Sequence, residues 1–566
     1  MDDEESAYTV ASDSDTTGEE KPTNPFPEIA IGIDIGTSKC SMAIWNGTQV
    51  QLITNARNQT AMQSYVTFKD DVPATGVTNQ PAHEQELLTG SAVFNVKRLI
   101  GRVDTDPIIH ASKNLPFLVQ TLDIGVRPFI AALVNNKVWR STTPEEVLAI
   151  YLVELRALAE TQLKRPIRTV VITVPVSFSR FQLTRIERVS AMAGLHVLRL
   201  IPEPTAIALL YAQHQQKNLN ENTSSGNEKV AVIFNMGAGY CDVAVTITAG
   251  GISHIKALAG IPTGGEDIVL NLIRYISSHG GNGLLRVASL NAIHDLSFRT
   301  TTEINVDLGN GVKISKVISR DEFEEVNRDV FSKCEAVVKK CLYDAKLQVE
   351  DINDLIMVGG CSNIPMIRKI VMGICKKEEL YTGIINPLEA AVIGAALEGA
   401  VASGISDPFG SLDLLTIQAT PMSIGIRADG KKFIPIIRRN TTMPARREMV
   451  FTTVNDNQTE ALIVVYEGDE ELLDKNHLLG YFKVVGIPSA PKGVPEVEVC
   501  LDIDSSNVLR VFAGVMEIGT RQRAGAVMEV RMPNVDDGHG WCSQALNTSY
   551  GTCLDLITVQ QKMVQP

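Results

Sequence analysis

The feature that most constrains this chain is a strand–turn–strand pattern that occurs twice. The first copy is IAIGIDIGTSKCSMAIW at 29–45, and the second is VIFNMGAGYCDVAV at 232–245. In each copy an Asp or Asn stands two residues before a glycine, between two apolar runs. Glycine permits a tight turn and a close approach, and the N–H groups of such a turn can cradle phosphate oxygens. One copy alone favours an ordinary hairpin, but two matched copies about 200 residues apart predict a duplicated domain facing one cleft.

A third glycine turn, LIMVGGCSNIP at 355–365, lies between an apolar run and a helix-like segment. A glycine pair that opens a helix after a strand is a place where a nucleotide can dock, and the alternative is an ordinary strand-to-helix turn. A carboxylate at a strand end can hold Mg²⁺ through water or orient a nucleophile.

The order of elements predicts two kinds of domain. Up to about residue 403, apolar β-like runs alternate with helix-like segments, which favours an α/β architecture. After Thr420, alternating patterns such as PEVEVCLDID at 495–504 and frequent turn signals predict an all-β domain, most simply a sandwich. The expected boundaries are a disordered acidic tail at 1–28, an α/β domain at 29–405, a linker at 406–419, a β-sandwich at 420–535 and a short tail at 536–566.

Composition excludes several classes of function. The net charge is −13, which argues against nonspecific nucleic-acid binding. No segment approaches the roughly 18 consecutive apolar residues that would span a membrane. The start, MDDEESAYTV, has neither a secretory nor a transit-peptide pattern, and the 9 cysteines form no CxxC pair. These features predict a cytoplasmic protein, with the nucleus as a second compartment.

Further stretches resemble signatures of the heat-shock 70 kDa chaperone family, the DnaK-like proteins. They are SAVFNVKRLIGR (91–102), TVPVSFS (173–179), IPEPTAIALLYA (201–212), PTGGED (262–267), INPLEAAVIGAAL (385–397), RRNTTMPARREMVFTTVNDNQ (438–458) and HLLGYFKVVGIPSAPKGVPEVEVCLDID (477–504). The resemblance covers about 29–535. It implies an α/β actin-like two-lobed nucleotide-binding domain, a linker and an all-β sandwich peptide-binding domain. The implied activity is that of an ATP-dependent chaperone of the stress response, which binds unfolded polypeptides and assists protein folding.

The resemblance also implies roles for residues of the cleft. Asp34 and Glu203 match carboxylates that place Mg²⁺ through water, and Lys97 matches a lysine needed for hydrolysis. Asn235 and Asp242 complete the expected catalytic set, and the alternative for Lys97 is a surface lysine. The residues expected to contact ATP or ADP are Gly36, Thr37, Ser38, Gly237, Ala238, Gly239, Tyr240, Gly264, Gly265, Glu266, Ser297, Gly359, Gly360 and Asn363.

Two further sets of residues follow from the resemblance. The expected peptide-groove positions are Ile424, Ile426, Phe451, Val454, Ala461, Ile463 and Val508, with a plain sandwich core as the alternative for Phe451. The expected interdomain positions are Pro175, Arg199, Asp413, Leu414 and Leu415. The implied partners are unfolded or extended hydrophobic polypeptides, J-domain co-chaperones and nucleotide exchange factors.

The second glycine turn departs from the family pattern at two places that matter chemically. Asn235 stands where relatives carry Asp, and Tyr240 stands where they carry Thr. An amide supplies neither a negative charge nor a base, and a tyrosine is far bulkier beside a phosphate. Ala238 replaces the middle glycine.

The expected adenosine wall and the peptide site are altered as well. Leu290, Ile293 and His294 replace a Glu, a Lys and an Arg, and Asn363 replaces a stacking Arg. Loss of two stacking arginines, worth about 1–3 kcal/mol each, predicts weak nucleotide binding. The arch over the peptide, with Ala428, Asp429 and Val454, differs, and Ala461 predicts a wider central pocket. The tail at 536–566 is too short for a helical lid, so peptide exchange should be fast.

Three functions are compatible with these patterns. The first is a divergent chaperone with weakened ATP binding and hydrolysis. The second is a nucleotide-insensitive peptide-binding or co-chaperone module, in which the α/β domain is a scaffold. The third, a sugar-kinase-like enzyme, is disfavoured because the linker and the β-domain match chaperones.

Overall fold

The computed structural model describes residues 29–68, 73–77, 91–121, 128–134, 138–221, 228–277, 283–308, 312–383, 386–405, 407, 410–428, 432–516, 523–524 and 554–556. The predicted acidic tail at 1–28 lies outside these residues, as does most of the predicted tail at 536–566. Among the described residues, no helix is both long enough and apolar enough to cross a membrane.

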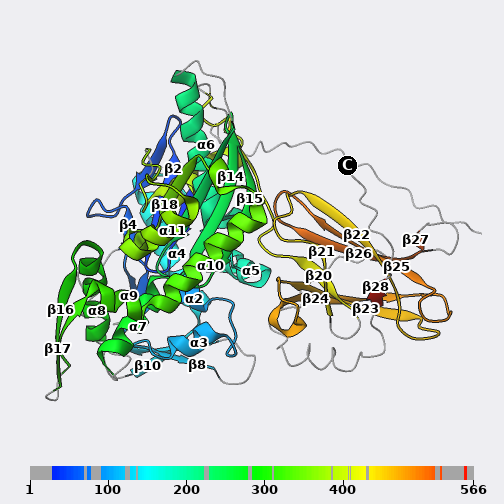
Figure 1. Cartoon of the computed structure of the whole chain (residues 1–566), viewed down its shortest axis with the longest axis horizontal. Helices are drawn as coiled ribbons and strands as arrows, with labels where there is room; N and C mark the ends of the chain where they lie inside the picture. The colour runs from blue at the N-terminus through cyan, green and yellow to red at the C-terminus, as the bar shows by residue number, and fades with distance from the viewer. Residues whose placement is uncertain are drawn as a thin grey trace, which may run out of the picture.

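Two mixed sheets with the same central arrangement build the N-terminal part (Figure 1). The first runs β12-β11-β1-β2-β3, with β4 also paired to β2, and the second runs β18-β13-β14-β15-β19. In both, a hairpin is joined through its first strand to a later parallel strand, β1 to β11 and β13 to β18. The two glycine turns close these two hairpins, so the predicted duplication is seen in the fold.

The strands of these sheets are β1 (Ile31–Ile35), β2 (Lys39–Trp45), β3 (Val50–Ile53), β4 (Ala61–Gln63), β11 (Thr169–Val174), β12 (His196–Pro202), β13 (Lys229–Met236), β14 (Cys241–Ala249), β15 (Ile252–Ile261), β18 (Asp354–Val358) and β19 (Leu415–Ile417). Three smaller sheets contain β5 (Tyr65–Thr67), β6 (Ala74–Thr75), β7 (Ala92–Phe94), β8 (Leu118–Gln120), β9 (Phe129–Val134), β10 (Val138–Thr142), β16 (Thr301–Asp307) and β17 (Lys313–Ser319). The main helices are α2 (Val96–Leu99), α3 (Pro107–Ser112), α4 (Pro144–Leu163), α5 (Arg180–Met192), α6 (Glu203–Glu221), α7 (Gly265–Ile276), α8 (Gly283–Phe298), α9 (Arg320–Val326), α10 (Arg328–Ala345), α11 (Pro365–Cys375) and α12 (Ala390–Ala402).

Local sequence explains where these helices begin and how closely they pack. Helix α4 begins with Pro144 after Thr143, whose side chain and that of Glu146 form a reciprocal capping box. The small residues of α12 let it lie directly on β1 and α6: a Cβ on Gly32 would come within 2.4 Å of the α12 backbone, and one on Gly394 within 1.9 Å of the α6 backbone. These helices therefore hold the two sheets together at the base of the cleft between them.

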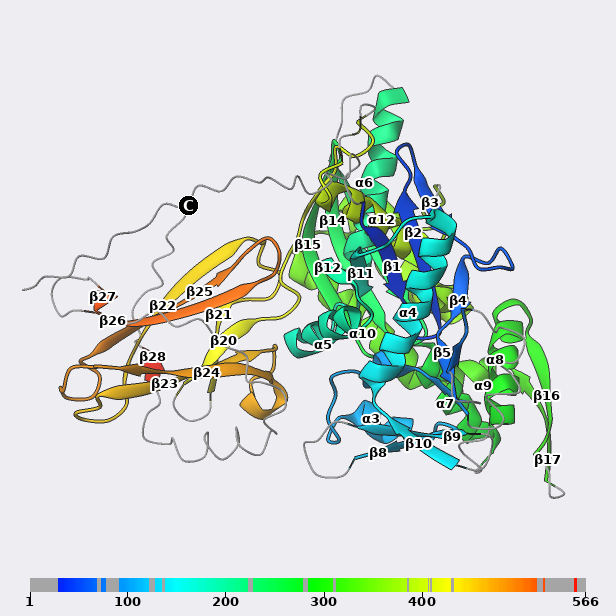
Figure 2. The same ribbon diagram turned by 180° about the vertical axis from the view of Figure 1, so that it is seen from behind.

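The C-terminal part consists of two antiparallel sheets around one core (Figure 2). One sheet runs β21-β20-β23-β24 and the other β27-β26-β25-β22-β28. Their strands are β20 (Ile424–Ala428), β21 (Lys432–Ile437), β22 (Ala445–Thr453), β23 (Glu460–Glu467), β24 (His477–Val485), β25 (Glu496–Ile503), β26 (Leu509–Met516), β27 (Arg523–Ala524) and β28 (Leu554–Leu556). Strand β28 belongs to the predicted tail, and its pairing was not expected from the sequence.

The segment that joins the two parts is itself a strand. Residues 415–417 form β19, which pairs in parallel with β15 at the edge of the second sheet. Leu412 and Leu414 are buried in the apolar cluster beneath that sheet, whereas Leu415 is 54% exposed. The predicted linker is therefore part of the N-terminal fold in this structure.

Candidate functional site

A cavity of about 460 Å³ lies between the two mixed sheets, and all three glycine turns contribute to its wall. Of the residues expected to contact ATP, those that line it are Gly36, Thr37, Ser38, Gly237, Ala238, Gly239, Tyr240, Gly265, Glu266, Gly359 and Gly360. Asp34, Lys97, Glu203 and Asn235 line it as well. The prediction that the repeated turns face one cleft therefore agrees with the geometry.

The glycines allow the turns to come close to one another. A Cβ on Gly239 would lie 2.3 Å from the Thr37 hydroxyl, so the second turn touches the first across the cleft. Gly359 has φ +83°, and a Cβ there would lie 2.3 Å from the carbonyl oxygen of Met236. Gly264 packs against the second turn, since a Cβ on Gly264 would lie 2.6 Å from the carbonyl oxygen of Ala238. Gly264 is not part of the cavity wall.

Lys97, Glu203 and Asn235 form a continuous polar chain in the cavity. The Lys97 ammonium lies 2.7 Å from one oxygen of Glu203, and the Asn235 amide donates a 2.6 Å hydrogen bond to the other. Burial alone would lower the pKa of Lys97, but Glu203 and Asp34 raise it above its ordinary value, so the ammonium stays charged. Lys97 is only 3% exposed, which excludes the surface alternative for this residue.

Two aspartates complete the charged part of the site. Thr173 donates a hydrogen bond to Asp34, yet burial and the neighbouring Glu203 raise the pKa of Asp34 to about 6. Asp242 is fully buried, and neither of its oxygens has a well-formed hydrogen bond among the described residues. Burial and Glu203 raise its pKa well above the ordinary value, and the backbone of Val176 offsets this only in part. Asp242 is not among the residues that line the cavity.

The raised pKa of Asp34 predicts a pH dependence of stability. The folded chain holds this proton up to about pH 6, whereas the unfolded chain releases it near 3.8, so the free energy of unfolding falls as the pH rises between these values. The Asp34→Asn variant has no titrating group at this position. Over that pH range the free energy of unfolding of the wild-type chain should therefore fall by about 1–3 kcal/mol relative to that of the variant. Urea unfolding in EDTA from pH 4 to 7.5 measures the difference. If the free energies of unfolding of the two proteins change with pH in the same way, Asp34 does not cause the pH dependence.

Tyr240 lines the cavity, as expected for a residue of the second turn, and its side chain is only 4% exposed. Its side chain is buried in the core of the first lobe, edge-on to Phe178 with ring centroids 5.6 Å apart. The hydroxyl donates to the backbone carbonyl of Lys97 at 3.2 Å, and the Lys97 ammonium lies 5.8 Å from the ring centroid. A residue of the second turn thus joins the two lobes through the first-lobe segment that carries Lys97.

The other end of the cavity is largely apolar. Leu290 and Ile293 line it, as the alignment with the family helix predicts, but His294 packs edge-on against Phe298 outside it. Ser297 does not line the cavity either. Its hydroxyl donates a hydrogen bond to the backbone carbonyl of Ile293 in the same helix.

Asn363, expected on the opposite wall, lies outside the cavity and accepts a hydrogen bond from Arg368. Arg286, which was not predicted as a site residue, lines the cavity. Its guanidinium pairs with Glu266 in a buried contact and lies 4.6 Å from the ring centroid of Phe94. No motif marks it in the sequence, because its partners Glu266 and Phe94 come from other segments.

The residues present fit a nucleoside phosphate with Mg²⁺. The volume is in the range of small-molecule sites, and the backbone turns and Lys97 are suited to phosphate oxygens. Asp34 and Glu203 are suited to a hydrated Mg²⁺. Among the described residues, no group of three or more His, Cys, Asp or Glu side chains is arranged to bind a metal ion directly.

Most of the expected peptide-groove residues are core residues in this structure. Ile424, Ile426, Phe451, Ala461 and Ile463 are at most 1% exposed and belong to the shared core of the two sheets. With β28 paired to β22, the core alternative weighed for Phe451 applies to all five. Val454 is partly exposed and Val508 is 46% exposed, while Asp429 of the expected arch lies outside the described residues.

The expected interdomain residues fall into two groups, Pro175 and Arg199 within the α/β part and Asp413, Leu414 and Leu415 within the linker. Pro175 is buried at the end of β11, and Arg199 pairs with Glu398 of α12. The Asp413 carbonyl accepts a 3.4 Å hydrogen bond from Gln216 of α6, and the amide of Leu415 bonds to Gly251. The contacts of Asp413 and Leu415 attach the linker to α6 and to the turn before β15.

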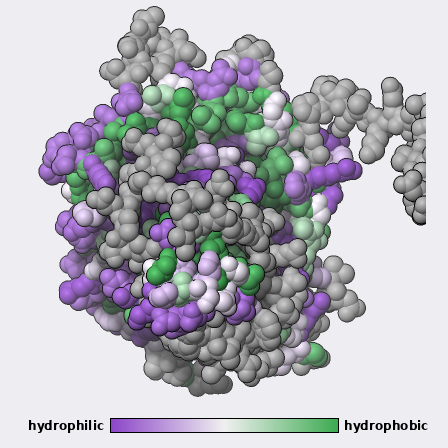
Figure 3. All heavy atoms as spheres, turned by 90° about the vertical axis from the view of Figure 1, so that its right-hand side faces the viewer, coloured by the Kyte–Doolittle hydropathy of each residue, from purple (hydrophilic) through white to green (hydrophobic). Residues whose placement is uncertain are grey.

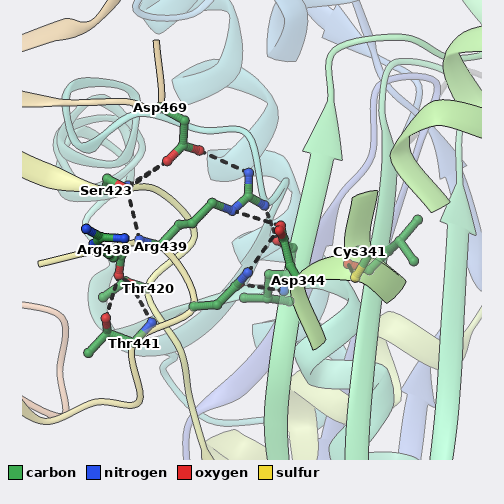
Figure 4. Close-up of polar contacts among 11 residues, drawn as sticks. Cys341, Asp344, Thr420, Ser423, Arg438, Arg439, Thr441 and Asp469 are labelled. Atoms are coloured by element: carbon green, nitrogen blue, oxygen red, sulfur yellow. Dashed lines mark hydrogen bonds and ion pairs between the residues drawn. The ribbon is translucent and has the colours of Figure 1, made fainter. Parts of the chain in front are cut away.

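Direct contacts between the α/β part and the β-domain were not predicted. Arg180 at the start of α5 lies 3.3 Å from Glu467 of β23 and donates to Asn507. Arg439 lies 3.3 Å from Asp344 of α10 and 3.0 Å from Asp469, and Figure 4 shows it between these two carboxylates. No local pattern marks these residues as contact residues, because their partners are far away in the sequence.

Breaking the Arg180–Glu467 pair should loosen this contact. Both side chains are buried, so Arg180→Met would leave the Glu467 carboxylate unpaired, and we expect the docked arrangement to weaken by about tenfold or more. Faster proteolysis within 410–417 measures the change. Arg188→Met, an exposed arginine of the same helix, is the matched control. The double change Arg180→Met/Glu467→Leu should restore protection, and equal cleavage of all four proteins would contradict this interpretation.

Comparison with known proteins gives consistent matches over almost the whole length. The family model described as "Hsp70 protein" matches residues 30–530. "Heat shock 70 kDa protein 8" of Arabidopsis thaliana is 69% identical over 563 residues, which is 99% of this chain and 100% of that protein. "Heat shock 70 kDa protein 2" of Paracoccidioides lutzii is 33% identical over 87% of this chain and 75% of its own length. "Heat shock cognate 70 kDa protein 3" of Dictyostelium discoideum is 32% identical over 86% of this chain and 78% of its own length.

Proposed function

This chain belongs to the Hsp70 protein family, and we propose that it is a chaperone that binds extended apolar segments of unfolded polypeptides in its β-domain under the control of weak ATP binding and slow hydrolysis. The observation that carries the proposal is that one chain of contacts connects the cavity to the β-domain. The second sheet bears Asn235 and the second turn, its edge strand β15 pairs with the linker strand β19, and Arg439 of the β-domain donates to Leu258 of β15. A change in cleft closure can therefore reach the β-domain through continuous structure.

The roles of the cavity residues follow from their contacts. The turns at 36–38 and 237–239 would orient the phosphates, and Lys97, charged and held by Glu203, would offset charge that develops on the transferred phosphoryl group. Asp34 and Glu203 would hold Mg²⁺, which when bound supplies further charge neutralisation. Slow hydrolysis follows because the Asn235 amide is hydrogen-bonded to Glu203 and adds no carboxylate to the site.

A second candidate function has its own support. The cavity end expected to hold adenosine is lined by Leu290 and Ile293, and Asn235 and Lys97 already satisfy both oxygens of Glu203. This arrangement favours a nucleotide-insensitive peptide-binding or co-chaperone module with the α/β part as a scaffold.

Two titrations separate these functions. Calorimetry with Mg-ATP on the full chain should show binding in the micromolar to millimolar range, and a labelled apolar peptide followed by anisotropy should be released faster when ATP is added. Peptide binding that ATP leaves unchanged, without heat of nucleotide binding, would favour the scaffold. No saturable peptide binding at high micromolar concentration would remove both candidates. J-domain co-chaperones and exchange factors as partners, and a cytoplasmic location, are further proposals on the same basis.

A further inference from the structure

A short segment from the far end of the chain pairs with an otherwise open strand of the β-domain. Residues Leu554–Leu556 form β28, which runs antiparallel to β22 with Leu554 opposite Thr453 and Leu556 opposite Phe451. The other edge of β22 is occupied by β25. Among the described residues, β28 is the only strand that pairs with this edge.

The place where β28 lies is the one expected to hold client peptides. Besides pairing with β22, β28 lies against β20 and β23 of the other sheet, so it spans the border of the two sheets. These three strands carry Phe451, Ile424, Ile426, Ala461 and Ile463, the central residues of the expected groove. Figures 1 and 2 show the short red strand beside β23 in both views.

The sequence of the segment suits an added strand. The stretch LDLIT at 554–558 has the same kinds of residue as DLLTI at 413–417, from which β19 forms at the edge of the second mixed sheet. Both are short apolar runs with one Asp and one Thr, and residues of this kind favour pairing with an open strand edge. An extended peptide that adds to such an edge is held by main-chain hydrogen bonds, which tolerate many sequences.

We propose that the C-terminal segment 554–556 is an intramolecular occupant of the client-peptide site, bound to β22 by strand addition and displaced when a client binds. This inference rests on the proposed function of the β-domain. Because the segment belongs to the same chain, its effective concentration at the site can reach the order of millimolar. It would therefore keep weakly binding client peptides out of the site even though its own affinity is low. It would also cover an open apolar strand edge of the β-domain. Figure 3 looks onto this end of the molecule, where hydrophobic areas lie among hydrophilic ones.

The test compares three full-length proteins: the wild-type chain, Leu556→Pro and Gln560→Pro. Proline removes a backbone donor from the β28 ladder, and the same change at 560 lies outside β28. Two fluorescent probes are used, an unrelated extended peptide of Leu, Ile and Val between lysines, and a peptide copying residues 551–560 with Ser for Cys553. Leu556→Pro should bind the unrelated peptide about tenfold or more tightly than the other two proteins, and the copied peptide should compete with it.

The outcomes separate this inference from the proposed function. If all three proteins bind the unrelated peptide equally well, tail docking is overturned while peptide binding stands. If Leu556→Pro binds only the copied peptide, tail docking stands and the proposed client function fails. If neither probe binds any protein, both ideas are overturned. Hydrogen exchange adds an independent readout, since amides of Phe451–Thr453 should exchange about tenfold faster in Leu556→Pro. If Leu556→Pro instead unfolds the whole β-domain, β28 is a permanent strand of the fold and the inference is wrong.

Discussion

Asn235→Asp should accelerate single-turnover hydrolysis of ATP by about 10²–10³-fold at saturating Mg²⁺, which is the usual effect of one positioned electrostatic group in an active site. In the wild-type chain the Asn235 amide donates to Glu203 at 2.6 Å and supplies no charge. An aspartate there would place a carboxylate at the end of the Lys97–Glu203 chain, where it could orient the attacking water or share the metal.

The same substitution should make the protein dependent on Mg²⁺. Two carboxylates at hydrogen-bonding distance repel each other unless a proton or a cation lies between them. The Asn235→Asp variant should therefore melt at a lower temperature in EDTA than the wild-type chain and recover when Mg²⁺ is added. Asn363→Asp is the matched control, because it makes the same chemical change at an exposed residue outside the cavity. Equal hydrolysis rates for the wild-type chain and Asn235→Asp would refute this account of the second turn.

Much of the α/β part could be predicted from the sequence, because its signals are local. A strand–glycine–strand pattern predicts a tight turn at the glycine. Its repetition predicts two similar halves that face each other. The positions of Thr37, Gly239 and Gly359 in one cavity wall follow from that symmetry together with the third turn. Lys97 and Glu203 were predicted as site residues from the family pattern; the structure brings them together in a 2.7 Å ion pair at the cavity wall, and their roles stay predictions.

The errors and omissions have a common physical cause, since each depends on contacts between distant residues. Tyr240 lines the cavity as predicted, but the packing of its ring in the hydrophobic core around the first sheet involves residues far away in the sequence and was not predicted. Ser297 was expected to face the cavity, and its hydroxyl instead bonds to the preceding helical turn. Alternating strand patterns cannot distinguish groove walls from core, so the burial of Ile426 and Ile463 was not foreseen.

The placement of Tyr240 predicts a large effect on stability. Tyr240→Thr would empty a buried aromatic site between Phe178 and Lys97, and we expect it to lower the free energy of unfolding of the α/β part by about 3–5 kcal/mol. Tyr240→Phe keeps the ring and loses only the hydrogen bond to the Lys97 carbonyl, so it should cost about 0.5–1.5 kcal/mol. Urea unfolding followed by circular dichroism measures both values.

The matched control is Tyr343→Thr on α10, where the tyrosine is 84% exposed and the same change should cost no more than about 0.5 kcal/mol. A loss at Tyr240 no larger than that at Tyr343 would show that the ring does not join the lobes. If the loss is as large as expected, restoring the family threonine at this position cannot by itself restore an ordinary ATPase. In that case the second turn depends on Tyr240 for its attachment to the core around the first sheet. Asn235 is then the residue at which the chemistry of the turn can be changed while the tyrosine keeps this attachment.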